Sequence, residues 1–147
     1  MAFIKHRVGI VAPPERVWQA ITDADQLSGW WASSAQWDSG TDESVSLDFE
    51  GLTTLVFNVV QREEERLLRL QNDGGLGPWN GSILEFSLHP DEGQTFVILT
   101  HENQEASDED FQFFTTKWPI FLVSLKGYLE TGEGRPFPND IKIEKDL

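Results

Sequence analysis

The alternation of apolar and polar residues changes along the chain and separates its first elements. Over residues 3–12 the two kinds of residue alternate loosely, which predicts a strand. Pro13 and Pro14 end that strand, because neither can donate a hydrogen bond to a neighbouring strand. "ERVWQAIT" and "DADQLSGWW" then follow helical spacing, so two short helices are expected, the second ending near Gly29.

The rest of the chain contains a strand-rich part followed by one long helix. Residues 44–102 form short apolar runs separated by turn residues, which predicts an antiparallel meander of five strands. From Asp108 to Glu130 large apolar residues recur every three or four positions, as on one face of a helix. Pro119 lies inside this helix and should kink or restart it.

This order of elements predicts an α+β fold. About six antiparallel strands would form a curved sheet around the long C-terminal helix, with the two short helices after the first strand. A curved sheet that wraps a helix leaves space between the two layers, and this space becomes a cavity where side chains do not fill it. The absence of a linker or repeat indicates a single domain over residues 1–147.

Two segments resemble signatures of the START-like (SRPBCC) superfamily. They are "APPERVWQAITDADQLSGWW" near the N-terminus and "KWPIFLVSLKGYLETGEGRPFP" near the C-terminus. The branch they resemble groups homologues of the activator of heat-shock-protein ATPase. The resemblance covers nearly the whole chain except residues 139–147. It implies a helix-grip fold with a hydrophobic tunnel between the sheet and the long helix. Relatives of this fold include lipid carriers, polyketide cyclases and chaperone-associated domains, so fold alone does not choose the function.

Charge and composition narrow the classes of partner. The 25 acidic and 11 basic residues give a net charge of −14, which disfavours binding to nucleic acid or to anionic membranes. No apolar stretch is long enough to span a membrane, and the N-terminus does not resemble a signal peptide. We therefore expect a cytoplasmic protein.

No catalytic, cofactor or metal motif stands out. The chain has no cysteine, no phosphate-binding loop, no G-x-S-x-G and no H-E-x-x-H. The mid-strand carboxylates Asp48 and Glu85 alternate outward. His6 and His101 are expected to point inward from neighbouring strands and could approach each other, but a partly buried histidine is more often structural than catalytic. No cofactor, metal or catalytic residue is therefore assigned.

Two tryptophans leave alternatives open. Trp31 either belongs to the core or lines the mouth of a pocket, because adjacent helical residues point in different directions. Trp79 follows a loop rich in glycine and proline, where it either acts as a lid or folds back over the sheet edge.

The favoured function is non-catalytic binding of a small hydrophobic or aromatic ligand in the tunnel. The alternatives are a chaperone-regulating interaction module, with Phe96 and Ile98 as an outward patch, and a cyclase or hydrolase acting on an apolar substrate. A homodimer or a chaperone partner is left open. The residues expected to contact a ligand are Trp31, Phe49, Trp79, Phe86, Leu99, His101, Phe114, Trp118, Phe121 and Leu122.

Overall fold

One curved antiparallel sheet forms most of the molecule. A computed structural model describes residues 3–73 and 77–147. The sheet has seven strands in the order β1-β7-β6-β5-β4-β3-β2, so neighbours in sequence are neighbours in space except for β1. The strands are β1 (Phe3–Ile10), β2 (Ser34–Asp38), β3 (Ser44–Phe49), β4 (Thr53–Glu63), β5 (Leu67–Asn72), β6 (Ile83–Asp91) and β7 (Gln94–Glu102).

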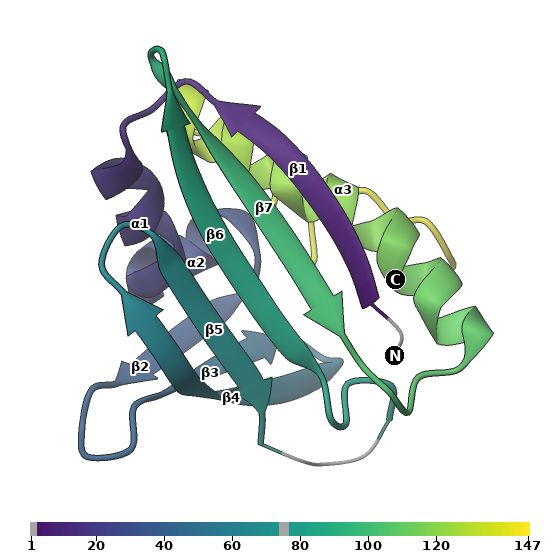
Figure 1. Ribbon diagram of the computed structural model, residues 1–147. Coiled ribbons are helices and arrows are strands. Elements are labelled where there is room, and N and C mark those ends of the chain that lie inside the picture. Colours follow the sequence, from purple (N-terminus) through teal and green to yellow (C-terminus); the bar gives the residue numbers. More distant parts are fainter. Residues whose placement is uncertain (1–2, 74–76) are drawn as a thin grey trace.

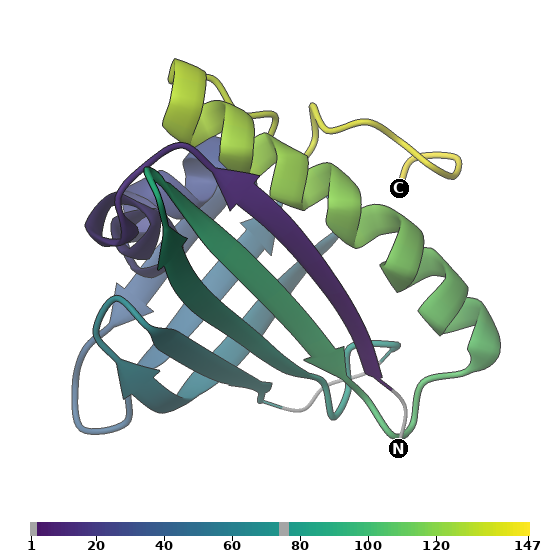
Figure 2. The same cartoon turned by 45° about the horizontal axis from the view of Figure 1, so that its top comes forward.

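Three helices complete the fold. The short helices α1 (Pro14–Thr22) and α2 (Ala24–Trp30) follow β1, and the long helix α3 (Asp108–Thr131) follows β7. The sheet curves around α3, while α1 and α2 cover one end of the molecule (Figures 1 and 2). The segment after α3, yellow in Figure 2, turns back and runs beside that helix. This arrangement confirms the predicted helix-grip fold, with one strand more than expected.

The additional strand is β2. Its sequence, "SAQWD", is short, and only Ala35 and Trp37 alternate inward. It lies at the edge of the sheet and pairs with β3 alone, from Ser34 opposite Asp48 to Asp38 opposite Ser44. A strand of five residues with two apolar side chains is too short to give a clear alternating pattern, so the sequence signal is weak.

Local signals set the ends of the helices. Pro14 occupies the first turn of α1, where its missing N–H costs nothing. Asp23 caps α2 by accepting hydrogen bonds from the backbone N–H groups of residues 25 and 26. Ser107 and Asp110 form a reciprocal capping box at the start of α3, and Gly132 ends the helix in a left-handed conformation with φ of 85°.

Helix α3 runs through Pro119 without a break. The expectation that Pro119 would restart the helix is not met, because residues on both sides belong to one continuous helix of 24 residues. Proline removes a single backbone hydrogen bond. The buried side chains Trp118, Phe121 and Leu122 flank that position and hold both halves of the helix against the sheet.

The tandem tryptophans lie in the centre of the core. The rings of Trp30 and Trp31 stack at a centroid distance of 5.5 Å, and both contact the ring of Phe86. The indole N–H of Trp30 donates to the carbonyl of Ala20 at 2.8 Å, which satisfies its buried polar atom. The pair therefore joins α1 and α2 to the sheet and to α3.

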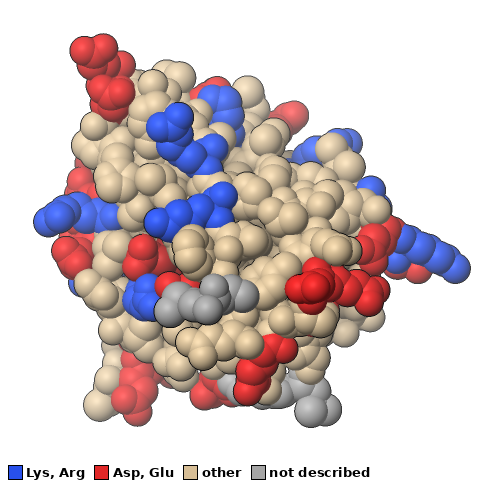
Figure 3. Space-filling view, turned by 45° about the vertical axis from the view of Figure 1, so that its right-hand side comes forward, with Lys and Arg blue, Asp and Glu red and all other residues tan. Residues whose placement is uncertain are grey.

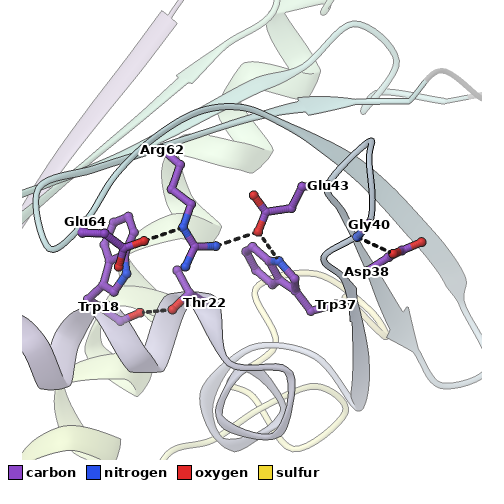
Figure 4. A network of polar contacts seen from close by, with 8 residues as sticks. All are labelled: Trp18, Thr22, Trp37, Asp38, Gly40, Glu43, Arg62 and Glu64. Atoms are coloured by element: carbon purple, nitrogen blue, oxygen red, sulfur yellow. Dashed lines mark hydrogen bonds and ion pairs between the residues drawn. The ribbon is translucent and has the colours of Figure 1, made fainter.

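A polar network on the other side of α1 fixes the β2–β3 end of the sheet (Figure 4). Arg62 on β4 forms ion pairs with Glu43 at 2.6 Å and Glu64 at 2.8 Å. Glu43 also accepts the indole N–H of Trp37 at 2.7 Å. The guanidinium of Arg62 lies 5.6 Å from the ring centre of Trp18 on α1. These contacts tie α1, β4 and the β2–β3 hairpin together.

The surface carries the acidic side chains that the sequence predicts. On the face seen in Figure 3, Asp and Glu lie mainly toward the margins, and an uncharged area with a few Lys and Arg side chains lies between them. Asp48 is exposed and Glu85 pairs with Arg69 at 3.0 Å on the outer face, as predicted. Within the described residues, none of the helices has the length and hydrophobicity needed to cross a membrane.

Candidate functional site

A small cavity remains between α3 and the β3–β4 part of the sheet. The volume of this cavity is about 80 Å³. Pockets for drug-sized ligands typically measure about 300–1,000 Å³, so this one holds a few waters or part of a small molecule as it stands. Its lining is almost entirely apolar and consists of Trp31, Phe49, Leu52, Thr53, Leu55, Trp79, Phe114, Lys117, Trp118, Phe121, Phe137 and Leu147.

Six of the ten residues predicted to contact a ligand lie in this wall. They are Trp31, Phe49, Trp79, Phe114, Trp118 and Phe121. The other four do not line the cavity. Phe86, Leu99, His101 and Leu122 point inward as expected, but their exposed fractions are 2% or less and neighbouring side chains fill the space around them. Among the residues that the structure describes, the predicted tunnel is therefore closed around these four side chains and open near β3 and β4.

Trp31 satisfies both interpretations that the sequence left open. Its side chain is 2% exposed and stacks within the core, yet one edge borders the cavity. Its ring lies 5.4 Å from that of Trp118 and 6.3 Å from that of Phe49. The residue thus forms the boundary between the closed core and the open space.

Trp79 folds inward and forms part of the cavity wall. Its ring stacks on His101 at 5.3 Å with an interplanar angle of 12°, and it meets Phe114 at 4.8 Å. The loop that carries Trp79 is fastened, because Asn103 donates its side-chain amide to the carbonyl of Pro78 at 2.8 Å. In this conformation Trp79 is a packed wall residue.

His101 lies directly behind Trp79 and is fully buried. Its Nδ1 accepts the indole N–H of Trp118 at 3.0 Å, and its Nε2 lies 2.8 Å from Oγ of Ser82. Since the indole can only donate, Nδ1 carries no proton, and the neutral ring must carry its proton on Nε2 and donate it to Ser82. Burial lowers the pKa of His101 to about 4, so the ring is neutral at physiological pH.

His6 occupies a different environment. It lies opposite Leu99 on the neighbouring strand β7, whereas His101 lies opposite Ile4. The nearest polar partner of His6 is Oγ1 of Thr115 on α3, at 3.4 Å. Partial burial lowers its pKa, and the hydrogen bond to Thr115 opposes part of that effect. The two histidines thus have separate partners, and no cluster of three potential metal ligands occurs among the described residues.

Among the described residues that line the cavity, Lys117 has the one charged side chain. The residue is 7% exposed. Its ammonium group forms an ion pair with Asp140 and donates to the carbonyl of Ile141 at 2.9 Å. It also lies 5.3 Å from the ring centre of Phe121. The site therefore combines an aromatic interior with one cation at its edge.

Asp140 is the partner of Lys117 and receives a second cation. Its carboxylate side chain is fully buried and lies 2.7 Å from Nζ of Lys142. Burial alone would raise the pKa of Asp140, but the hydrogen bonds and charges of Lys117 and Lys142 outweigh it and lower that pKa. The group is thus an ionised carboxylate beside the cavity.

The C-terminal segment supplies part of the wall that sequence reasoning missed. The ring centre of Phe137 lies 5.6 Å from that of Phe49, and Leu147 lines the cavity together with Leu52. Residues 139–147 lie outside the segments that resemble a known family, so no role was expected for them. Lys117 did leave a signal in the sequence, because it stands three residues after Phe114 in a stripe that is otherwise apolar.

A match to a family model covers most of the chain. Residues 11–130 match the model described as Activator of Hsp90 ATPase homolog 1-like protein. No curated protein matches the chain.

Solved structures with similar folds include one of substantial identity. The solution structure of the Aha1 dimer from Colwellia psychrerythraea is 34% identical, with a TM-score of 0.81 over 91% of this chain and 100% of that chain. DynU16, a protein of the dynemicin biosynthetic locus, has 22% identity and a TM-score of 0.80 over 90% of this chain and 48% of its own. CalU16 from Micromonospora echinospora has 20% identity and a TM-score of 0.71, over 88% of this chain and 77% of its own. The last two share the fold.

Proposed function

We propose that this chain, which belongs to the Activator of Hsp90 ATPase homolog 1-like family, binds a small apolar or aromatic molecule in the cavity between α3 and the sheet. The fold is one that supports ligand binding, since a helix gripped by a curved sheet has an apolar interface with room inside. In this chain the room lies beside β3 and β4.

The composition of the cavity wall carries the proposal. Seven aromatic side chains meet a space that stays open, which gives a flat apolar ligand contacts on several sides. Side chains in a protein core normally pack without such gaps, because an empty apolar space loses van der Waals contacts. A gap that is kept therefore favours a binding role. An apolar space bordered by a few polar groups, here Thr53 and Lys117, is typical of ligand sites.

Ligand discovery tests the proposal directly. Freshly purified protein would be examined by native mass spectrometry, and then mixed with fatty acids, sterols and flavonoids while its melting temperature is followed. We expect a co-purified ligand or a rise in melting temperature with at least one compound. If neither occurs, and a ligand-free experimental structure has side chains filling the cavity, the proposal is wrong.

A second candidate function is regulation of a chaperone. The family description and the 34% identical Aha1 structure favour it. The outward residues Phe96 and Ile98 offer little apolar surface for a partner, because both are half-buried and the guanidinium of Arg7 lies 4.7 Å from the ring of Phe96. A change in the ATPase rate of an Hsp90-type chaperone on adding this protein would support the candidate. An unchanged rate and no co-purified chaperone would remove it.

A dimer is a separate question, raised by the Aha1 structure, which was solved as a dimer. Light scattering at two protein concentrations would give the mass in solution. We do not propose His101 as a catalytic base, because both of its nitrogens are engaged and it does not border the cavity.

A further inference from the structure

The ion pair between Lys117 and Asp140 joins the cavity to the C-terminal segment. Lys117 projects from α3 at the wall of the cavity, and Asp140 reaches it from the segment that follows the helix. Both side chains are almost completely removed from solvent. A lysine in such a place needs an anionic partner, because an unpaired buried charge is strongly unfavourable.

The attachment of the segment changes at Phe137. Up to that residue the backbone is fastened to the core: the N–H of Phe137 donates to the carbonyl of Trp31, and Ser33 donates to the carbonyl of Phe137, both at 2.9 Å. Beyond it, the polar contacts of residues 139–147 with α3 go to Lys117, through Asp140 and the carbonyl of Ile141. Two further contacts are local: the N–H of Asn139 donates to the carbonyl of Pro136 at 2.8 Å, and Nζ of Lys142 lies 4.2 Å from the ring centre of Phe137. Lys117 thus supplies the attachment of this segment to α3.

The segment also limits the size of the cavity. Leu147 lines the cavity, and about 80 Å³ is left while the segment is in place. Moving residues 139–147 away would remove Leu147 from the wall and expose Lys117. The enlarged site would have an aromatic interior and an unpaired cation at its edge.

We propose that the ligand is an apolar carboxylic acid whose carboxylate takes the position of Asp140 on Lys117 and releases residues 139–147 from the opening. The inference rests on the proposed function and names its ligand class. A carboxylate restores the charge balance of Lys117, which a neutral molecule of the same shape cannot do. The displaced Asp140 keeps Lys142 as a partner, since that lysine belongs to the same segment.

The test compares an acid with its neutral amide. The probes are 4-phenylbutyrate and 4-phenylbutanamide, and their affinities would be measured by isothermal titration calorimetry at pH 7. We expect the acid to bind the unaltered protein about tenfold or more tightly than the amide, because it alone pairs with Lys117. Lys117→Met should abolish this preference.

Asp140→Asn tests the same ion pair by changing the carboxylate instead of the lysine. It removes the internal competitor for Lys117, so the affinity for 4-phenylbutyrate should rise by about threefold or more while the amide changes little. This variant keeps the test valid even if Lys117→Met fails to fold. Lys126→Met and Glu130→Gln are matched controls, because they break an ion pair of 2.8 Å on the same helix away from the cavity. Both controls should leave the two affinities unchanged.

Hydrogen exchange reports the displacement itself. Adding 4-phenylbutyrate should speed hydrogen exchange of the backbone N–H groups in residues 139–147. At the same concentration 4-phenylbutanamide should speed it less, because it cannot take the place of Asp140 on Lys117. Equal binding of acid and amide, or an unchanged exchange rate in that segment, would overturn the inference while leaving the proposed function intact. Binding of neither probe would count against the proposed function and against the inference with it.

Discussion

Trp118 donates its indole N–H to Nδ1 of His101 across the interface between α3 and β7, at 3.0 Å. This hydrogen bond connects the helix to the sheet immediately behind the cavity wall. It exists only while Nδ1 is unprotonated, because a proton there would face the indole hydrogen. The charge state of one buried histidine is therefore coupled to the packing of the helix.

His101 should titrate far below the ordinary pH range of a histidine. Nitrogen-15 NMR should find this ring neutral at pH 7, with its proton on Nε2, and should give a pKa near 4 because of burial. A pKa near the ordinary 6.5, or a proton on Nδ1, would contradict the assigned hydrogen bonds.

Stability should follow the same titration. The unfolded chain takes up a proton on His101 as the pH falls below 6.5, whereas the folded protein resists protonation until about pH 4. The unfolded state thus binds more protons in this range, so the free energy of unfolding should drop by about 3 kcal/mol between pH 7 and pH 4. Because the pKa of His6 is also lowered, urea titrations should be repeated in a His6→Gln background. A free energy of unfolding that does not change between pH 7 and pH 4 in this background would contradict the prediction.

Core substitutions should separate closed from open parts of the interface. Phe86 is 1% exposed and lies apart from the cavity, so Phe86→Ala should lower the free energy of unfolding by about 3–5 kcal/mol. Leu68→Ala, at a fully buried site, should cost about 4 kcal/mol, and Leu55→Ala, at the cavity wall, about 2 kcal/mol. Chemical denaturation measures all three. Equal losses for the two leucine variants would indicate that the cavity is filled.

Gly134 should tolerate no side chain. A Cβ at this position would collide with the backbone carbonyl of Gly29 and approach the Cα of Trp30 at 3.1 Å. Since backbone cannot rotate away, Gly134→Ala should lower the free energy of unfolding by about 1–3 kcal/mol. Gly40→Ala, in an exposed loop, is the control and should change the melting temperature little. A neutral Gly134→Ala would mean that the segment after α3 is not packed against α2.

The buried ion pair should be strongly coupled. A double-mutant cycle with Lys117→Met and Asp140→Asn should give an interaction energy of about 1–3 kcal/mol. Removing either partner leaves the charge of the other buried without a full counter-charge. The cycle with Lys126→Met and Glu130→Gln should give a smaller value, because that pair is more exposed. Equal coupling in the two cycles would show that burial of Lys117 is unimportant.

The sequence predicted which side chains point inward more reliably than which ones meet open space. Alternation placed Phe86 and Leu99 on the inner face, and both are there. Whether an inward residue touches a cavity depends on how its neighbours fill the volume around it, and residue pattern does not encode this. Trp30 and Trp31 together fill the space next to Phe86, which closes the tunnel at that level.

Two features escaped prediction for physical reasons. The edge strand β2 alternates over five residues only and has two apolar side chains, and pairing with β3 stabilises it. The segment after Phe137 has no regular structure, so its place over the cavity depends on tertiary contacts such as the one between Lys117 and Asp140. The "TGEGRP" motif, by contrast, has a local explanation, since Gly132 ends α3 and Gly134 allows close approach to α2.

The position of a bound ligand decides whether the cavity between α3 and the sheet is a binding site. With leucine methyl groups labelled, nuclear Overhauser effects from the ring protons of bound 4-phenylbutyrate would identify its neighbours. Binding in the cavity predicts effects to Leu52 and Leu55, which line it, and none to Leu99 and Leu122, which do not. Effects confined to other leucines, or none to Leu52 and Leu55 at saturating ligand, would contradict ligand binding at this site.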